Sequence, residues 1–182
     1  MWPWRKDPIE EIIRKNVDDD FQMFAAGENA PAISLVEAFE RRVGFSLPSD
    51  YRQYSTSKLG GIYLVVKEEL WPRPKENQIG PFWTFLYGLM VYGFAKDIPE
   101  MMDIRIQTGH FSEMMKGRYV PFLKVIGDAN VYCFDENQLV QRFQHETGEM
   151  EPVPKTFTEV LDFEVAELRK RKDRKLSEIK LA

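Results

Sequence analysis

The chain has 182 residues, of which 43% are apolar, 30% charged and 13% aromatic, and its formal net charge is −4. This composition is typical of a single globular domain with a sizeable core, and it excludes a strongly basic, dedicated nucleic-acid binder. The only cysteine, Cys133, excludes an internal disulfide and suits a reducing compartment. Because the sequence also has no signal peptide and no apolar run of bilayer length, we expect a cytoplasmic protein without membrane contact.

Residues 1–30 are predicted to form a short helix and an acidic linker. Asp7 and Pro8 are a typical helix start, because aspartate caps a helix and proline fits its first position. Three isoleucines then share one helical face. The three aspartates at 18–20 are interpreted as a solvated acidic turn, since consecutive residues do not converge on a metal ion without a loop of suitable shape.

Two helices are predicted next. The first begins near Pro31, carries apolar residues at helical spacing and ends at Gly44, a natural stop. The second begins at Ser49 or Asp50 and ends before a glycine pair at 60–61. A loop rich in proline and glycine follows at 71–81.

Six runs of β-branched and aromatic residues predict strands at 62–66, 82–86, 89–94, 120–126, 131–134 and 139–144. A Gly-Asp-Ala-Asn turn joins the fourth run to the fifth, as in a hairpin. The fifth run is almost entirely apolar, which indicates a central strand covered on both faces. Since the links are short, we expect an α+β fold whose mostly antiparallel sheet has about six strands and whose helices pack mainly on one face.

Two further helices are predicted around the central hairpin. Asp97 can cap a helix that carries Met101 and Met102, and these methionines form either an adaptable partner surface or, as is more common, part of the core. A second helix begins near Thr156, where Glu159 completes a capping box. Its basic end, 169–182, is predicted to be a solvated helix end or a frayed tail, with contacts to nucleic acid or anionic lipid as the alternative.

The sequence contains no recognisable catalytic motif, so we expect no enzyme activity, no metal and no cofactor. His110 and His145 have no second ligand at helical spacing, and Cys133 should be an inert buried thiol. Acidic residues near hairpin ends leave one alternative open, because paired carboxylates could bind a metal or act as acid and base in a hydrolase. These residues are Asp128, Asp135 and Glu136.

Two stretches carry a family resemblance. The first, at 40–54, reads Glu-Arg-Arg-Val-Gly-Phe-Ser-Leu-Pro-Ser-Asp-Tyr-Arg-Gln-Tyr and precedes the glycine pair at 60–61. The second, at 119–135, is a hairpin with a small-residue turn and an acidic residue after its second strand. Together they resemble the SUKH superfamily, which includes fungal cell-wall assembly regulators of the Smi/Knr type and many bacterial immunity proteins. The resemblance covers 31–168, which we expect to be the SUKH-like domain.

The resemblance implies a non-enzymatic protein-binding module, most typically an immunity protein that binds and neutralises a bacterial toxin effector. A regulatory scaffold of the cell-wall assembly type is the alternative, and long disordered arms would favour it. Residues 7–50 contain ten acidic and four basic residues, so a basic partner such as a nuclease would be complementary. A nucleic acid is not expected as a direct partner.

A protein-binding surface needs aromatic anchors within a polar rim. Trp71 and Trp83 are the candidate anchors, because loops and sheet edges present such residues, although a tryptophan beside prolines often only packs its loop. The candidate charged rim consists of the hairpin-end residues Asp128, Asp135 and Glu136, each of which could equally stabilise its own turn.

Overall fold

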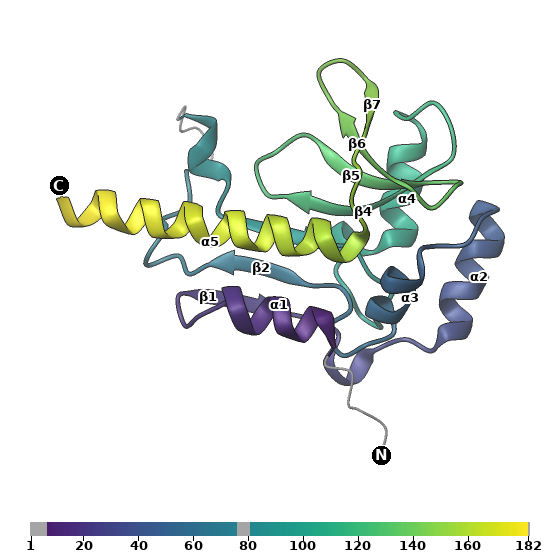
Figure 1. Ribbon diagram of the computed structural model, residues 1–182, viewed down its shortest axis with the longest axis horizontal. Coiled ribbons are helices and arrows are strands. Elements are labelled where there is room, and N and C mark those ends of the chain that lie inside the picture. Colours follow the sequence, from purple (N-terminus) through teal and green to yellow (C-terminus); the bar gives the residue numbers. More distant parts are fainter. Residues whose placement is uncertain (1–6, 76–80, 182) are drawn as a thin grey trace.

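The computed structural model describes residues 7–75 and 81–181 (Figure 1). In this part of the chain, seven strands form one sheet, and each strand pairs antiparallel with the next in sequence. The fold is therefore α+β with an antiparallel meander, as predicted. The strands are β1 (Phe21–Phe24), β2 (Tyr63–Val66), β3 (Gly88–Val91), β4 (Tyr119–Val125), β5 (Val131–Asp135), β6 (Val140–Gln144) and β7 (Glu149–Pro152).

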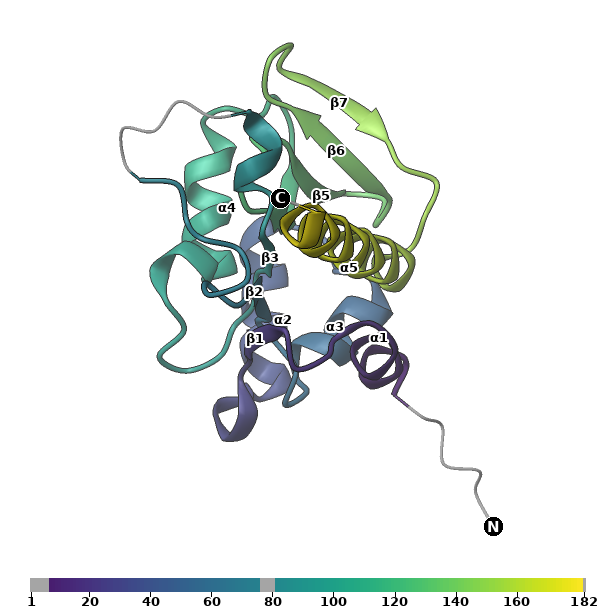
Figure 2. The ribbon, with the colours of Figure 1, turned by 90° about the vertical axis from the view of Figure 1, so that its left-hand side faces the viewer.

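The helices cover the sheet unequally. The α-helices in the described residues are α1 (Pro8–Asn16), α2 (Ile33–Val43), α3 (Ser49–Ser55), α4 (Ile104–Ser112) and α5 (Phe157–Leu181). The 3-10 helices are η1 (Gly27–Asn29), η2 (Phe82–Phe85) and η3 (Glu100–Met102). Helices α1, α3 and α5 pack on one face, whereas α4 lies against β4 on the other (Figure 2).

A cluster of four buried aromatic rings joins the sheet to two helices. Phe122 on β4 and Phe134 on β5 stack with their centroids 4.1 Å apart. Tyr51 on α3 and Phe157 on α5 meet edge to face at 5.0 Å and pack against this pair. Such ring pairs contribute about 0.5–1.5 kcal/mol each beyond the area they bury. The start of α5 is thereby fixed on the central strands.

The turn between α2 and α3 depends on two residues of the 40–54 motif. Gly44 adopts the left-handed conformation at φ +86°, and its N–H donates to the Glu40 carbonyl at 2.8 Å. Glu40 is buried, and its carboxylate accepts the Leu47 N–H at 2.7 Å and lies 3.3 Å from the Arg52 guanidinium. A buried carboxylate is tolerated when it is paired in this way. The motif therefore sets the angle between two helices.

Helix α3 ties the motif to the rest of the molecule. The Tyr51 hydroxyl donates to the Tyr92 carbonyl at 2.7 Å, and the Tyr54 hydroxyl accepts the Ile62 N–H at 2.9 Å. The Asp50 carboxylate accepts both the backbone N–H and the hydroxyl of Thr158 at 3.1 Å, at the start of α5. The motif therefore holds α5 in place as well.

The structure corrects one of the predicted strands and adds two. Residues 82–86 do not form a strand: Phe82–Phe85 is the 3-10 helix η2, which follows Pro81 and exposes Phe82 and Trp83. Conversely, β1 and β7 were not predicted. Each has four residues and lies at an edge of the sheet, and the sequence of β7, Glu-Met-Glu-Pro, has no apolar run. The sheet consequently has seven strands where about six were expected.

The helix predicted from Asp97 begins later. Asp97 has a φ of +61°, which is unsuited to capping, and Asp103 caps α4 by accepting the Arg105 N–H at 2.8 Å. The two methionines divide between the predicted alternatives, since Met101 is 51% exposed whereas Met102 is buried.

Candidate binding groove between η2 and α5

Both predicted anchors line one groove, which lies between η2 and the C-terminal half of α5. Figure 1 shows where α5 runs towards the end of the chain. The groove has a volume of about 590 Å³. One wall is formed by Trp71, Trp83, Thr84 and Leu86, and the other by residues 167–178 of α5. The groove thus joins an aromatic segment to the basic stretch near the end of the chain.

Trp71 supports the aromatic wall from within. Its side chain is buried, and its indole N–H donates to the Thr84 carbonyl at 3.0 Å. Arg73 donates to the Trp71 carbonyl at 2.9 Å and lies over the Tyr87 ring at 3.9 Å. These contacts connect the 71–73 loop to η2. The loop-packing alternative therefore describes Trp71, which is not available to a partner in this conformation.

Trp83 lines the groove, and its neighbour in sequence, Phe82, is exposed beside it. Their exposed fractions are 63% and 61%, which are the largest among the apolar residues described as exposed. Adjacent exposed aromatic side chains are unusual on a surface that contacts only water, and they mark interaction sites. Trp83 therefore remains a candidate anchor.

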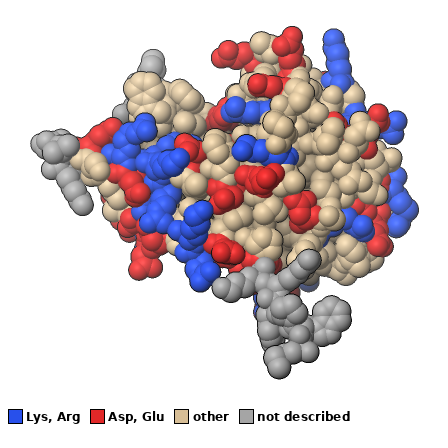
Figure 3. Space-filling view, viewed as in Figure 1, with Lys and Arg blue, Asp and Glu red and all other residues tan. Residues whose placement is uncertain are grey.

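The α5 wall is charged along one helical face. Its six residues recur at spacings of three and four, which places them on the same side of the helix. They are Glu167, Lys170, Arg171, Arg174, Lys175 and Glu178. Lys170 and Glu167 form an ion pair at 2.6 Å. Figure 3 shows basic side chains gathered over this end of α5.

Arg171 is the least solvated cation of the groove. Two of its guanidinium nitrogens, Nε and Nη2, are buried and have no hydrogen-bond partner among the described residues. Burial lowers the pKa of Arg171, and the nearby carboxylates of Glu164, Glu167 and Asp128 offset this only in part. An arginine remains charged at neutral pH even so. A positive charge is therefore held at the inner edge of the groove.

Residues 32–162 match the model of the SMI1 / KNR4 family (SUKH-1), and this region is well over half of the chain. The chain belongs to the SUKH-1 family. No curated protein matches it. The aromatic wall of the groove lies inside the matched SUKH-1 region, whereas the charged α5 wall lies beyond it. The groove therefore lies between residues inside the matched region and residues beyond it.

In this SUKH-1 protein, two of the three predicted rim residues stabilise turns. Asp128 accepts the Asn130 N–H at 2.9 Å and pairs with Arg142 at 2.8 Å. Asp135 accepts the backbone N–H groups of Asn137 and Leu139, each at 2.9 Å, and the Gln141 side-chain amide at the same distance. Their carboxylates are thus already used within the protein.

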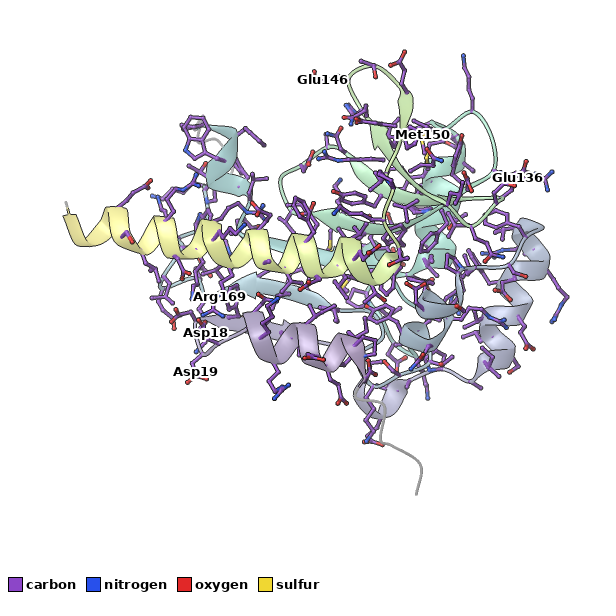
Figure 4. All side chains as sticks on the ribbon, viewed as in Figure 1. Asp18, Asp19, Glu136, Glu146, Met150 and Arg169 are labelled. Carbon is purple, nitrogen blue, oxygen red and sulfur yellow. The ribbon has the colours of Figure 1, made fainter. Side chains whose placement is uncertain are left out.

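Glu136, the third predicted rim residue, is exposed. Its carboxylate lies 3.4 Å from the Arg118 guanidinium, and both side chains are more than half exposed. Figure 4 shows Glu136 at the periphery of the molecule. An ion pair of this kind contributes little to stability, so Glu136 is free to respond to a partner.

A polar contact between the sheet and α5 lies behind the groove. The Tyr132 hydroxyl donates to the Glu164 carboxylate at 2.7 Å, and Glu164 is buried. Burial, together with the Glu164 charge, raises the pKa of Tyr132. The tyrosine is therefore neutral at physiological pH, and the contact fixes α5 two turns before Arg171.

The remaining candidate reactive groups do not gather in one place. Cys133 is fully buried, which raises the pKa of its thiol. His110 on α4 and His145 after β6 are both exposed and belong to different elements. The described residues contain no group of three or more His, Cys, Asp or Glu side chains that could hold a metal ion. None of their helices has the length and apolar character of a membrane-spanning segment.

The end of α5 is fastened to the start of the chain. Lys172 is buried and donates to Asp18 at 2.7 Å and to Asp20 at 2.8 Å. Arg169 donates to the Lys15 carbonyl at 2.6 Å, and Figure 4 shows Arg169 beside Asp18. Asp18 and Asp20 remain partly exposed in their turn, but both also accept hydrogen bonds from Lys172, and the burial of Lys172 departs from the solvated end predicted for 169–182.

Proposed function

We propose that this SUKH-1 protein is a cytoplasmic, non-enzymatic module that neutralises a bacterial toxin effector by binding and covering it. Membership of a family associated with protein binding supports the first part of this proposal. A regulator of the cell-wall assembly type would use the same binding step on a different partner, and it is the second candidate. Both forms require a surface that can hold a protein.

One observation carries the proposal: Trp83 and Phe82 are exposed side by side on a short helix that is itself held in place. Trp71 and Thr84 connect η2 to the loop before it through a 3.0 Å hydrogen bond. An anchor that is already ordered loses little conformational entropy on binding, which favours affinity. Tryptophan is also the side chain that most often dominates the energy of a protein interface.

Acidic side chains elsewhere on the surface suit a basic partner such as a nuclease. Glu136, Glu146, Glu149 and Glu151 are exposed around β5, β6 and β7, and Figure 3 shows acidic groups at this end of the molecule. Charges of this kind steer association more than they hold the complex. The acidic N-terminal segment contributes less than its composition suggests, because Asp18 and Asp20 bind Lys172.

The hydrolase alternative finds less support in the geometry. Asp128 precedes β5 and Asp135 ends it, so the two carboxylates lie at opposite ends of a five-residue strand. Such a strand is roughly 15 Å long, which is too far for two groups to act on one bond. Each carboxylate also accepts hydrogen bonds within its own turn.

The proposal is tested with a candidate toxin domain taken from the gene neighbourhood or from a pull-down. We expect the purified protein to bind and neutralise that toxin, and Trp83→Ala to weaken binding by about thirtyfold, as truncation of an interface anchor typically does. Phe163→Ala is the matched control, because Phe163 is 46% exposed on α5 but does not line the groove. Calorimetric titration gives both affinities.

Trp71→Ala separates binding from folding. Because Trp71 is buried, its truncation should lower the free energy of unfolding by about 3–5 kcal/mol. Trp83→Ala should leave this free energy within about 0.5 kcal/mol of the parent. Absence of any binding or neutralisation by the parent protein would refute the immunity proposal, and turnover of a small molecule that depends on His110 or His145 would refute the whole class.

A further inference from the structure

The α5 wall of the groove has an ordered charge pattern. Two carboxylates, Glu167 and Glu178, enclose four cations along one helical face. The eleven steps between them correspond to roughly 16 Å along the helix axis. This length matches about five residues of an extended chain, at roughly 3.3 Å per residue. The groove is therefore long enough for a short strand-like segment.

The cations in the middle of this wall are incompletely paired. Lys170 has Glu167 as its partner. Among the described residues, no carboxylate forms an ion pair within 4.0 Å with Arg171, Arg174 or Lys175. The buried nitrogens of Arg171 lack hydrogen bonds in the described part of the chain. Cations without a paired carboxylate, of which Arg171 is also partly desolvated, favour an anionic ligand, because carboxylates form short charge-assisted hydrogen bonds with guanidinium groups.

We propose that the groove between η2 and α5 binds an extended, acidic segment of a partner protein, with one apolar side chain packed against Trp83. The carboxylates of this segment pair with Arg171, Arg174 and Lys175, while Glu167 and Glu178 limit its length at either end. Trp83 supplies apolar area at the opposite wall, so the segment is recognised by charge and by one side chain. This inference rests on the proposed protein-binding function and specifies the chemistry of the bound element.

A single-stranded nucleic acid fits the same surface less well. The basic strip from residue 170 to 175 spans roughly 8 Å, and glutamates at both of its ends would repel a continuing phosphate backbone. Sequence-tolerant binders of single strands present several stacking rings in a row, whereas this groove exposes one tryptophan. The observations thus favour a short acidic peptide.

The first test is a titration of the full-length, 15N-labelled protein followed by NMR. The probe is a blocked peptide of sequence Asp-Glu-Leu-Asp-Glu, and the matched control is Lys-Arg-Leu-Lys-Arg. We expect the acidic peptide alone to shift the Trp83 indole N–H and the amides of 170–175. Its affinity should fall severalfold between about 50 and 300 mM salt, because exposed ion pairs are screened over this range.

Two double variants with equal net charge sharpen the test. Arg174→Glu with Lys175→Glu, the groove variant, reverses two of the cations proposed to pair with the segment, and we expect at least a tenfold loss of affinity for the acidic peptide, as for loss of two charge pairs. Arg14→Glu with Arg41→Glu reverses two exposed cations on α1 and α2 and should leave affinity within about twofold, as only long-range attraction changes. Thermal unfolding of both variants checks that they remain folded.

The outcomes are distinct. Absence of a shift at Trp83 with millimolar acidic peptide would overturn the proposal, and so would an oligo-dT strand that binds more tightly and is lost in the groove variant. If the groove variant still binds and neutralises the toxin with parental affinity, the groove inference fails while the proposed function stands. If the protein binds the acidic peptide but neutralises no toxin, the groove inference stands while the proposed function fails.

Discussion

Lys172, close to the end of the chain, donates a hydrogen bond to Asp18, close to its start, across 2.7 Å. Asp20 accepts a second one at 2.8 Å, and the ammonium lies 5.1 Å from the centre of the Phe21 ring. Only 3% of the Lys172 side chain is exposed, whereas the two aspartates are exposed by 39% and 38%. This contact joins α5 to the segment between α1 and β1.

The first prediction concerns the loss of this contact. Asp18→Asn with Asp20→Asn should lower the free energy of unfolding by about 2 kcal/mol, because it removes two of the three carboxylates that pair with the buried Lys172 and leaves Asp173 at 3.3 Å, although the exposure of the aspartates reduces the effect. Lys172→Met should cost less, since methionine removes the buried charge and can pack on Phe21. Urea denaturation measures both. Asp19→Asn is the control, because Asp19 is exposed and does not bind Lys172.

The second prediction is the pH dependence of this stabilisation. Burial acts to raise the pKa of Asp18, but hydrogen bonds from Lys172 and the Asp20 N–H outweigh it and lower the pKa. For Lys172, burial acts to lower the pKa, and hydrogen bonds to Asp18, Asp20 and Asp173 outweigh it and raise the pKa to about 12. Both shifts favour the charged forms in the folded protein.

The directions of these two pKa shifts define the pH range over which the contact stabilises the folded protein. The contribution of Asp18 is complete above its unfolded pKa, about 3.9, and is lost as the pH falls through its lower folded value. The contribution of Lys172 is complete below about pH 10.4 and is lost as the pH rises towards 12. The stability difference between the parent and Asp18→Asn should therefore be constant from about pH 5 to 9 and shrink on acidification. A difference that grows in acid would contradict the assignment.

The parts of the fold that were predictable are those in which neighbouring residues decide the structure. Gly44 at the end of α2, the capping box of Thr156 and Glu159, and the turn at 127–130 each follow from local turn chemistry. The resemblance of 40–54 to SUKH proteins was also informative, because Glu40 and Asp50 make contacts that the fold requires.

The parts that were missed depend on contacts distant in sequence. Lys172 and Asp18 are 154 residues apart, so neither charge run indicates the other. The aromatic-rich sequence of 82–86 is compatible with a strand and with an exposed 3-10 helix, and only the tertiary structure distinguishes them. The spacing of the charged residues in 167–178 indicates a charged helical face from the sequence alone. That this face lines a groove could not be predicted, because it depends on Trp83 lying opposite in the folded protein.

The third prediction tests the joint between α2 and α3. Gly44→Val should lower the free energy of unfolding by about 1–3 kcal/mol, because a β-branched residue is strained at φ +86°. A Cβ there would also lie 3.2 Å from the Arg118 guanidinium. Gly44→Asn should cost less, since asparagine tolerates the left-handed region. Equal stability of Gly44→Val and the parent in urea denaturation would show that the joint is not constrained.

The fourth prediction distinguishes the roles of the two neighbouring carboxylates at the end of β5, Asp135 and Glu136. Asp135→Ala should lower the free energy of unfolding by about 1–3 kcal/mol, because it removes the acceptor of three hydrogen bonds. Glu136→Lys should leave stability within about 0.5 kcal/mol, since its ion pair with Arg118 is exposed. Urea denaturation of each variant distinguishes the structural residue from the exposed one.

If Glu136 steers a basic partner, Glu136→Lys should slow association severalfold and weaken its dependence on salt, with little change in the dissociation rate. Stopped-flow binding to the cognate toxin across ionic strength measures both rates. Glu113→Lys is the control, because it makes the same change in net charge at an exposed position next to α4. Equal slowing by the two variants would mean that net charge alone acts, and that Glu136 does not belong to a localised rim.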